Sequence, residues 1–458
     1  MSRRLTTGFV TETMRGRGYD VMPGAERDIT GGAADSRKVQ PGDLFTAFPG
    51  ENVDGNAYVT AALEAGAAAV ICTRRPEGAW PGATVVVAPD ATRAVGELAH
   101  AWRMECHPRV VGITGTVGKT TAKEFTAGLL TQRFNTHKSG GNFNSREGLP
   151  LALMSLTRDH EVSVLEIAMD SKGEIAELAA IAEPEVGVVL NIGLTHVSKL
   201  GSIEAIAAEK LSLVRGLPGD ATAVLNVDDP RVAAVLPELR CQVLTFGESD
   251  SAVLRRGPVT DRGLAGTSFD VTFGETTERV NSPLPGEHTI PAVLTAMAAG
   301  IALGMNLRGA ASAAERTEVE GRARVLKLEN GATVIDDRYN SSPASLHGAL
   351  RMLGGLPGKR VALLGRMAEL GDHERSEHVA AGKVAADACD VLICSGETCR
   401  ALAGAAREAG HADVRWFETK DEAARDAAGL LGEGVTVLVK ASRGEAFETI
   451  LPLLGVAA

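Results

Sequence analysis

The feature that most constrains this chain is the stretch at residues 110–121, Val-Val-Gly-Ile-Thr-Gly-Thr-Val-Gly-Lys-Thr-Thr. β-Branched residues up to Ile113 favour a buried strand and residues 122–130 favour a helix, so the glycines lie at a strand-to-helix junction. Such a junction turns backbone N–H groups toward an anion, beside the positive end of the helix. The stretch therefore predicts a phosphate-binding loop.

Each residue type in this loop has a use in holding a nucleoside triphosphate. The residues expected to contact it are Gly115, Thr116, Gly118, Lys119, Thr120 and Thr121. Lys119 supplies a positive charge for the terminal phosphates, and the hydroxyl of Thr120 can bind a magnesium ion. The longer P-loop pattern has a glycine where Ile113 stands, so the match is to a shorter Gly-x-x-Gly-Lys-Thr form. The alternative interpretation is a tight turn that carries a solvated lysine.

Length and charge narrow the classes of protein that the chain can be. At 458 residues it is too long for one hydrophobic core, and about three domains are expected. With 44% apolar and 23% charged residues it is a folded globular chain. The formal net charge of −11 argues against broad nucleic-acid binding and against attachment to anionic lipid, because there is no basic excess.

The cysteines and the apolar segments indicate a compartment. Six cysteines are scattered along the chain without a Cys-x-x-Cys pair, which is typical of reduced thiols in a cytosol. The N-terminal segment holds no apolar core of signal-peptide length, and no run approaches the length of a membrane span. We therefore expect a cytoplasmic protein, and nothing in the sequence demands more than a monomer.

Alternating strand and helix patterns divide the chain into three α/β domains. Residues 1–108 form a small first domain, residues 109–311 a central domain with a doubly wound, mostly parallel sheet, and residues 312–458 a smaller Rossmann-like domain. Strands are expected at residues 44–48, 67–72, 85–88, 110–114, 162–167, 186–192, 223–226, 243–246, 324–328, 333–336, 360–364, 391–394 and 435–439. Short hinges would let the domains close around a ligand.

Polar residues just after the strands are candidates for a site, because ligands bind beyond the carboxyl ends of such a sheet. Glu166 closes an apolar strand and can supply the carboxylate that a magnesium nucleotide needs, or be the first solvated position. His196, in the loop after the next strand, can bind a second cation or lie at the surface. Lys210 follows the alanine-rich residues 203–209, and these residues alone predict an exposed helix lysine.

The third domain carries two further candidates. The segment at residues 336–340, Asp-Asp-Arg-Tyr-Asn, follows a strand, and its paired aspartates can act as general acid and base, bind a ribose or form a solvated turn. Arg322 precedes the first strand of this domain. It can reach a γ-phosphate once the domains close, or it can form an interdomain salt bridge. The sequence does not decide between these two roles.

Together these stretches resemble the Mur ligases, ATP-dependent amide-forming enzymes of peptidoglycan precursor assembly, over nearly the whole chain. Residues 35–37 (Asp-Ser-Arg) and 41–45 (Pro-Gly-Asp-Leu-Phe) are similar to the N-terminal UDP-sugar domain of that family, and residues 114–120 to its ATP loop. Residues 141–144 (Gly-Asn-Phe-Asn) and 336–340 look like the type that adds D-alanyl-D-alanine to UDP-N-acetylmuramoyl-tripeptide. The Asp-Asn-Pro-Arg motif of the diaminopimelate-adding type is not found.

The resemblance implies a reaction and its participants. ATP would activate a carboxylate of the UDP-linked muramoyl peptide as an acyl phosphate. The amine of D-alanyl-D-alanine would attack it, leaving an amide, ADP and phosphate. Residues 1–108 would bind the UDP-sugar peptide, residues 109–311 would bind ATP with two magnesium ions, and residues 312–458 would bind the incoming amine.

The resemblance also assigns roles to residues. The metal ligands would be Thr120, Glu166, His196 and Lys210, with Lys210 carbamylated, which reverses the interpretation of an exposed lysine. The catalytic residues would be Lys119, His196, Lys210, Arg322 and Asn340. Arg322 and Asp337 would approach the nucleotide. The substrate contacts would be Ser36, Arg37, Asn142, Asn144, Ser145, Asp337, Tyr339 and Asn340.

Several positions depart from the family pattern. The family has asparagines that approach the adenine where Thr289 and Pro291 stand, and a proline has no backbone N–H to donate. Ser145 stands where an asparagine pair would be completed, and Ser198 stands where a glutamate is usual. The contacts to adenine are therefore open.

Two arginines lead to a second interpretation. Arg366 stands where the family has an aspartate, and Arg338 replaces a small hydroxyl residue. Two added positive charges near the cleft of the third domain suggest a more acidic amine than D-alanyl-D-alanine, or a specialised metabolite. A nucleotide-binding protein without turnover is disfavoured by the intact metal set, and a GTPase would carry an Asn-Lys-x-Asp motif that the chain lacks.

Overall fold

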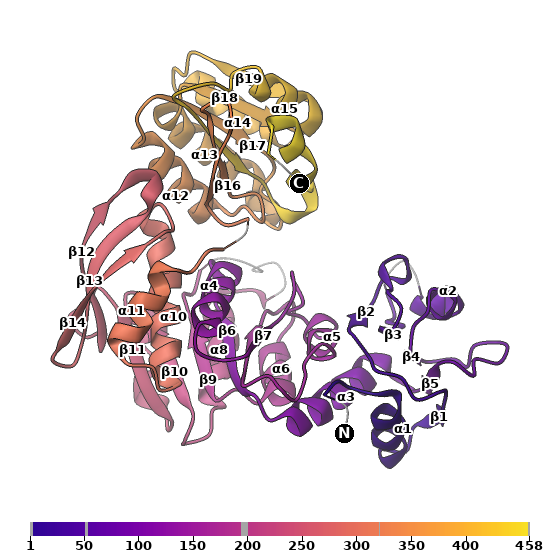
Figure 1. The fold of residues 1–458 in the computed structure, drawn as a ribbon. Helices are drawn as coiled ribbons and strands as arrows, with labels where there is room; N and C mark the ends of the chain where they lie inside the picture. The colour runs from indigo at the N-terminus through magenta and orange to yellow at the C-terminus, as the bar shows by residue number, and fades with distance from the viewer. Residues whose placement is uncertain (1–2, 51–53, 194–199, 320, 457–458) are drawn as a thin grey trace.

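The computed structural model describes residues 3–50, 54–193, 200–319 and 321–456, and the strands of these residues form three sheets. Each sheet belongs to one stretch of the chain, and the three units follow one another in space in chain order (Figure 1). The predicted three-domain α/β fold is confirmed. Within the described ranges no helix combines the length and the apolar character needed to cross a membrane.

The N-terminal unit is a small sheet of strand order β1-β5-β4-β3-β2, parallel except for β1. Its elements are α1 (Thr7–Gly16), β1 (Asp20–Met22), β2 (Gly32–Ala33), β3 (Leu44–Thr46), α2 (Val59–Glu64), β4 (Ala69–Cys72), β5 (Thr84–Val87) and α3 (Ala91–Cys106). Trp102 of α3 is buried, and its indole N–H donates to the backbone oxygen of Leu156, 3.0 Å away in the central unit. The first two units therefore share one hydrophobic core.

The central unit carries the long sheet, of order β14-β13-β12-β11-β10-β9-β6-β8-β7. Its strands are β6 (Arg109–Thr114), β7 (Thr136–Lys138), β8 (Val162–Glu166), β9 (Val186–Val189), β10 (Thr222–Asn226), β11 (Gln242–Gly247), β12 (Leu254–Asp261), β13 (Thr267–Phe273) and β14 (Thr276–Ser282). Its helices are α4 (Lys119–Thr131), α5 (Gly148–Leu153), α6 (Glu174–Ala182), α8 (Ile203–Arg215), α9 (Pro230–Ala233), α10 (Ile290–Ala302) and α11 (Leu307–Glu315). Strands β6 to β11 run parallel, in line with the predicted mostly parallel sheet, and β12 pairs parallel with β11.

Strands β12, β13 and β14 form an antiparallel extension that the sequence patterns did not reveal. Much of the surface of β12 and β14 is exposed, whereas β13 between them is largely buried, and β12 is interrupted by a register shift between Arg256 and Val259. Strands with one solvated face and a bulge lose the apolar run that marks a buried parallel strand.

The C-terminal unit is a sheet of order β15-β16-β20-β17-β18-β19, parallel except for β15. Its elements are β15 (Arg324–Lys327), β16 (Thr333–Asp336), α12 (Pro343–Gly354), β17 (Lys359–Leu364), α13 (Glu374–Ala388), β18 (Val391–Ser395), α14 (Cys399–Glu408), β19 (Val414–Phe417), α15 (Lys420–Ala428) and β20 (Val435–Lys440). Alternate strand residues enter two different core clusters, so both faces of this sheet are buried under helices.

The predicted boundary between residues 311 and 312 needs correction, because it falls inside α11. Ala310, Ala311, Ala313 and Ala314 of this helix all pack in the core of the central sheet, and Val319 belongs to the same cluster. An alanine-rich helix gives no compositional break at residue 311. The central unit therefore extends to residue 319.

Candidate functional site

The predicted phosphate loop lies between β6 and α4, at the carboxyl edge of the central sheet. Gly118 has a φ of 85° and precedes the first residue of α4. The ammonium of Lys119 folds back over the turn and donates to the backbone oxygens of Gly115 (2.9 Å) and Thr116 (3.3 Å). Burial lowers the pKa of Lys119. Thr120 and Thr121 lie in the first turn of α4, so all six predicted nucleotide contacts are gathered here.

Asn191, at the end of β9, holds this loop in shape. Its Oδ1 accepts from the backbone N–H of Thr116 (3.1 Å) and of Val117 (2.9 Å), and its Nδ2 donates to the backbone oxygen of Val117 (2.9 Å). The only signal for Asn191 in the sequence is that it is polar and lies just after a strand. The three bonds give it a supporting role that only the folded chain reveals.

Glu166 closes β8 directly beside β6, where it pairs in register with Ile113. The side chain is buried, with 3% exposed. One carboxylate oxygen, Oε1, accepts from Nδ2 of Asn144 at 2.8 Å, whereas Oε2 is buried and has no hydrogen-bond partner among the described residues. A buried carboxylate oxygen without a partner suits a cation, because an unpaired buried charge is costly.

The position of Lys210 corrects the prediction made from the residues alone, which was an exposed helix lysine. It is 1% exposed, and its Nζ donates to the backbone oxygen of Gly115 over 2.9 Å. Burial, and then the charge of Lys119, lower the pKa of Lys210 well below its usual value. The signal was the spacing of Ile206, Lys210 and Leu213, which places all three on the buried face of α8.

The remaining predicted metal ligand, His196, lies outside the described residues. So does Ser198, one of the departures from the family pattern. Within the described part of the chain, no cluster of three or more His, Cys, Asp or Glu side chains is arranged to hold a metal. The residues there that could hold a cation are the hydroxyl of Thr120 and the carboxylate of Glu166.

Arg322 and Tyr339 of the C-terminal unit lie near the phosphate loop. The Arg322 guanidinium carbon lies 4.1 Å from the centre of the Tyr339 ring, and that of Arg443 lies 5.4 Å from it. Arg322 Nε and Tyr339 Oη are buried without a hydrogen-bond partner in the part of the chain that is described. Burial lowers the pKa of Arg322, and nearby acidic groups that include Asp337 and Glu166 oppose this. The charge of Glu166 in the central unit therefore acts on both Arg322 and Tyr339.

Asp337 and Asn340 are held by a lysine that the sequence analysis missed. Lys440, at the end of β20, is buried and donates to Asp337 Oδ2 (2.5 Å) and to the backbone oxygen of Asn340 (2.9 Å). The other Asp337 oxygen accepts from the backbone N–H of Ala323 at 3.2 Å. Burial lowers the pKa of Lys440, and Asp337 opposes that shift. A charged residue closing an apolar strand was the signal, as it was for Glu166.

The predicted substrate residues fall into two groups. Asn142, Asn144 and Ser145 lie in the loop between β7 and α5, where Ser145 Oγ accepts from the backbone N–H of Gly148 at 3.2 Å. Ser36 and Arg37 lie in the N-terminal unit, on a short 3-10 helix that follows β2. Arg37 is exposed and pairs with Asp35 at 2.8 Å. In Figure 1 α5 lies between β2 and the central sheet, so the structure does not gather this pair with the phosphate loop.

The two unusual arginines are each matched by a carboxylate. Arg338 donates to the buried Asp336, and Arg366 Nε donates to Glu374 Oε1 at 2.6 Å. Their charges are therefore already compensated within the C-terminal unit. The geometry gives no support to a preference for acidic amines.

The two departures near the expected adenine position have local explanations. Thr289 Oγ1 donates to the backbone oxygen of Gly286 at 2.7 Å. Pro291 is in the first turn of α10, where a helix has no partner for a backbone N–H. Pro291 also borders a cavity of about 80 Å³. Its lining residues are Asn226, Asp228, Phe246, Arg256, Glu287, Ile290, Pro291 and Leu294.

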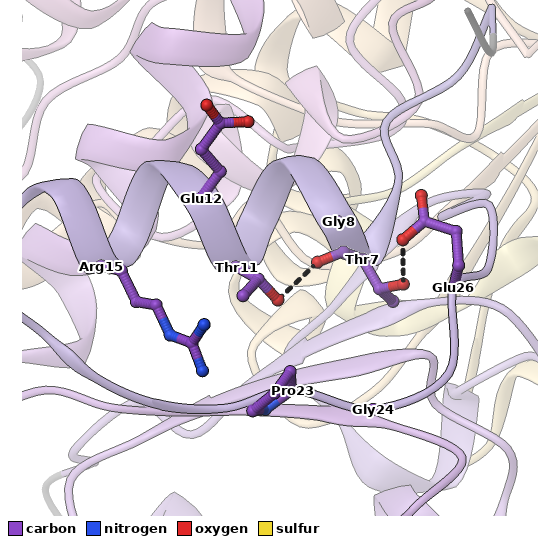
Figure 2. A pocket seen from close by; sticks show the side chains of 8 residues that line it. All are labelled: Thr7, Gly8, Thr11, Glu12, Arg15, Pro23, Gly24 and Glu26. Atoms are coloured by element: carbon purple, nitrogen blue, oxygen red, sulfur yellow. Dashed lines mark hydrogen bonds between the residues drawn. The ribbon is translucent and has the colours of Figure 1, made fainter.

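A larger cavity of about 440 Å³ lies elsewhere, between α1 and the segment after β1 (Figure 2). Its lining residues are Thr7, Gly8, Thr11, Glu12, Arg15, Pro23, Gly24 and Glu26. Thr11 Oγ1 donates to the backbone oxygen of Thr7 at 2.8 Å, and Glu12, Arg15 and Glu26 are exposed. None of the predicted site residues lines it. This groove belongs to the N-terminal unit, apart from the phosphate loop.

Family models cover most of the chain. The model for the Mur ligase family, catalytic domain, matches residues 28–103, that for the Mur ligase middle domain residues 113–300, and that for the Mur ligase, glutamate ligase domain, residues 321–443. A UDP-N-acetylmuramoyl-tripeptide–D-alanyl-D-alanine ligase of Bacillus subtilis (strain 168) is 34% identical over 428 residues, which are 92% of each chain. The chain belongs to the Mur ligase family.

Other relatives of this Mur ligase agree. The ligase of the same name from Escherichia coli (strain K12) is 30% identical over 458 residues, 98% of each chain. A crystal structure of MurF from Acinetobacter baumannii has a TM-score of 0.87 and 25% identity over 99% of both chains. MurF from Thermotoga maritima, solved in complex with ADP, has a TM-score of 0.77 and 26% identity over 92% of this chain and 96% of that one. The family resemblance inferred from the motifs is confirmed.

Proposed function

We propose that this Mur ligase joins D-alanyl-D-alanine to UDP-N-acetylmuramoyl-tripeptide and converts ATP to ADP and phosphate. The observation that carries the proposal is that Arg322, stacked on Tyr339 of the C-terminal unit, lies close enough to Lys119 and Glu166 of the central unit for their charges to interact. Relatives that bear this activity in their names align over nearly the full length. The proposal also includes that the enzyme is a monomer and acts in the cytoplasm.

In the first half-reaction an acceptor carboxylate attacks the γ-phosphate of ATP, and ADP leaves. The phosphoryl group carries charge during transfer, so Lys119 and Arg322 stabilise it electrostatically from two sides. Magnesium, when bound, would neutralise phosphate charge, with Thr120 and Glu166 at one ion and His196 and Lys210 at a second. Oε2 of Glu166, which has no hydrogen-bond partner in the described part of the chain, fits this role.

Lys210 could serve as a ligand only in a modified form. An ammonium cannot bind a cation, but a neutral amine reacts with carbon dioxide to give a carbamate, which is negatively charged. The buried setting that lowers the pKa of Lys210 favours the neutral amine. We therefore include carbamylation of Lys210 in the proposal.

In the second half-reaction the amine attacks the acyl phosphate, phosphate leaves and an amide forms. No side chain has to act as a nucleophile, so orientation carries much of the catalysis. Asn340, with Asp337 and Tyr339, would orient the dipeptide from the C-terminal unit. The N-terminal unit would hold the UDP-sugar through Ser36 and Arg37, and the loop before α5 would hold the peptide through Asn142, Asn144 and Ser145.

The test is phosphate release with ATP, a set of UDP-muramoyl tripeptides and a panel of amines, with the product mass measured. We expect release with D-alanyl-D-alanine and a product that carries the dipeptide. The variant Lys119→Ala should fold and lose turnover by about 10²- to 10³-fold. Phosphate release with a different amine and none with D-alanyl-D-alanine would overturn the proposed substrate. Undiminished turnover of the variant would overturn the proposed site.

A further inference from the structure

Lys123 is a buried lysine that the phosphate chemistry does not use. It lies on α4, one turn after Lys119, and is 0% exposed. Its Nζ donates to the backbone oxygens of Ser139 (2.7 Å) and Gly141 (3.3 Å), and pairs with Glu124 Oε1 at 2.9 Å. The helix that begins at the phosphate loop is therefore tied to the segment after β7.

That segment, residues 139–145, is named here the acceptor loop. Ser139 Oγ accepts from the backbone N–H of Glu166 at 3.2 Å, and Asn144 Nδ2 donates to the Glu166 carboxylate at 2.8 Å. A Cβ on Gly141 would lie 4.0 Å from Tyr339 Oη of the C-terminal unit. The acceptor loop thus contacts the candidate cation ligand and lies close to the unit that approaches from the other side.

A buried ammonium is a costly way to fill space. Replacing a buried charged group by an apolar side chain is often neutral or stabilising, so burial of Lys123 is not explained by stability alone. The ammonium instead fixes two backbone oxygens of the acceptor loop at defined distances. Phe125 and Leu129 already provide α4 with apolar packing.

We propose that Lys123 is a positioning residue that sets the acceptor loop against the nucleotide-binding helix, so that Asn142 and Asn144 meet the acceptor peptide in register with the bound phosphates. This inference rests on the proposed function for the role of these asparagines. Loss of the tie would leave the nucleotide in place and displace the peptide. The effect would therefore fall on the acceptor and not on ATP.

The experiment compares Lys123→Met, which keeps the apolar stem, with Lys123→Arg, which keeps charged donors. Lys138→Met is the matched control, because Lys138 is an exposed lysine that pairs with the same Glu124. The measurements are the Kd for ADP and kcat and KM for the UDP-muramoyl tripeptide and for D-alanyl-D-alanine. We expect Lys123→Met to bind ADP normally and to lose about 10- to 100-fold in kcat/KM for the UDP-muramoyl tripeptide. Lys123→Arg should recover part of the loss, and the control should resemble the wild type.

A double-mutant cycle with Asn144→Ala separates positioning from general destabilisation. If Lys123 acts through the loop, the losses from Lys123→Met and Asn144→Ala do not add. Additive losses, or an equal loss of ADP affinity, would overturn the inference. Should Lys123→Met not fold, the same cycle with Lys123→Gln, which removes the charge and keeps a polar side chain, decides it.

Hydrogen exchange gives a reading that needs no substrate. The backbone N–H of Phe143 donates to Gly140 O at 3.0 Å, and that of Asn144 to Asn142 O at 2.8 Å. Lys123→Met should speed exchange of these amides and leave those of α4 unchanged. A wild type that does not turn over the peptide would refute the proposed function alone, whereas unchanged loop exchange would refute the role of Lys123.

Discussion

Lys210 on α8 donates a hydrogen bond of 2.9 Å to the backbone oxygen of Gly115, the same oxygen that accepts from Lys119 at 2.9 Å. Two ammonium groups that share one acceptor, with that of Lys210 fully buried, repel each other. Burial and this neighbouring charge both lower the pKa of Lys210. The arrangement therefore favours a neutral amine at Lys210, beside the phosphate loop.

The first prediction follows from a carbamate at this position. Lys210→Ala should lose at least about 100-fold in turnover, because the second cation loses a ligand. Acetate or formate should restore part of it by occupying the vacated space. Phosphate release measures both effects, and a carbamate carbon signal in protein equilibrated with labelled carbon dioxide tests the modification. Lys172→Ala, at an exposed lysine, is the control. No response to the added carboxylates would contradict the carbamate.

The second prediction concerns the contact between Arg322 and Tyr339. Arg322→Ala should lower kcat by about 10²- to 10³-fold and leave ADP binding largely unchanged. The reason is that the variant loses the positive charge that stabilises the phosphoryl group during transfer. Tyr339→Phe keeps the ring that supports the guanidinium, so its loss should be smaller than that of Tyr339→Ala. Steady-state kinetics on the three variants measures the loss in kcat of each. Arg324→Ala, at an exposed neighbouring residue, is the control. A Phe variant as impaired as the Ala variant would show that the hydroxyl, not the ring, matters.

Local patterns predicted the parts of the site that depend on near neighbours. A β-branched run followed by glycines and a helix-forming segment located the phosphate loop, and an apolar strand ending in Glu166 located the buried carboxylate. Long-range packing decided the rest. Nothing near Lys123 in the sequence announces that it reaches Ser139, and the partner of Lys440 is more than a hundred residues away. The sequence patterns did not predict the antiparallel strands β12 to β14, because pairing with neighbouring strands, and not an apolar periodicity of their own, defines them.

The third prediction concerns Arg338 and the choice of amine. Asp336 is 1% exposed, and Arg338 forms an ion pair with it. Arg338→Ser should therefore lower the free energy of unfolding by about 3 kcal/mol, because it leaves a buried carboxylate without its partner charge. The enzyme should still prefer D-alanyl-D-alanine over acidic amines. Arg366→Ser, at a more exposed pair, should change stability by less than about 1 kcal/mol. Chemical denaturation and the amine panel measure the two properties. A switch in preference on Arg338→Ser would revive the interpretation of an acidic amine.

The fourth prediction is a pH dependence of stability that arises at His137. The ring is buried between β7, β8 and α5, with Nδ1 2.9 Å from Ser163 Oγ and Nε2 3.0 Å from Ser155 Oγ. Burial lowers its pKa to about 4. Because the unfolded chain binds the proton near pH 6.5, it takes up protons before the folded chain does. The stability is therefore full above about pH 6.5 and is lost as the pH falls toward 4, by about 3 kcal/mol.

His137→Gln keeps an amide in place of the ring and removes the titration. Its free energy of unfolding should fall less steeply than that of the wild type between about pH 6.5 and 4. The slope should not vanish, because burial also lowers the pKa of the half-buried His160. Urea denaturation at a series of pH values measures the slopes, with His373→Gln, at an exposed histidine, as the matched control. Parallel curves for the wild type and His137→Gln would mean that His137 is not the group that titrates, since a buried neutral ring has to accept its proton on unfolding.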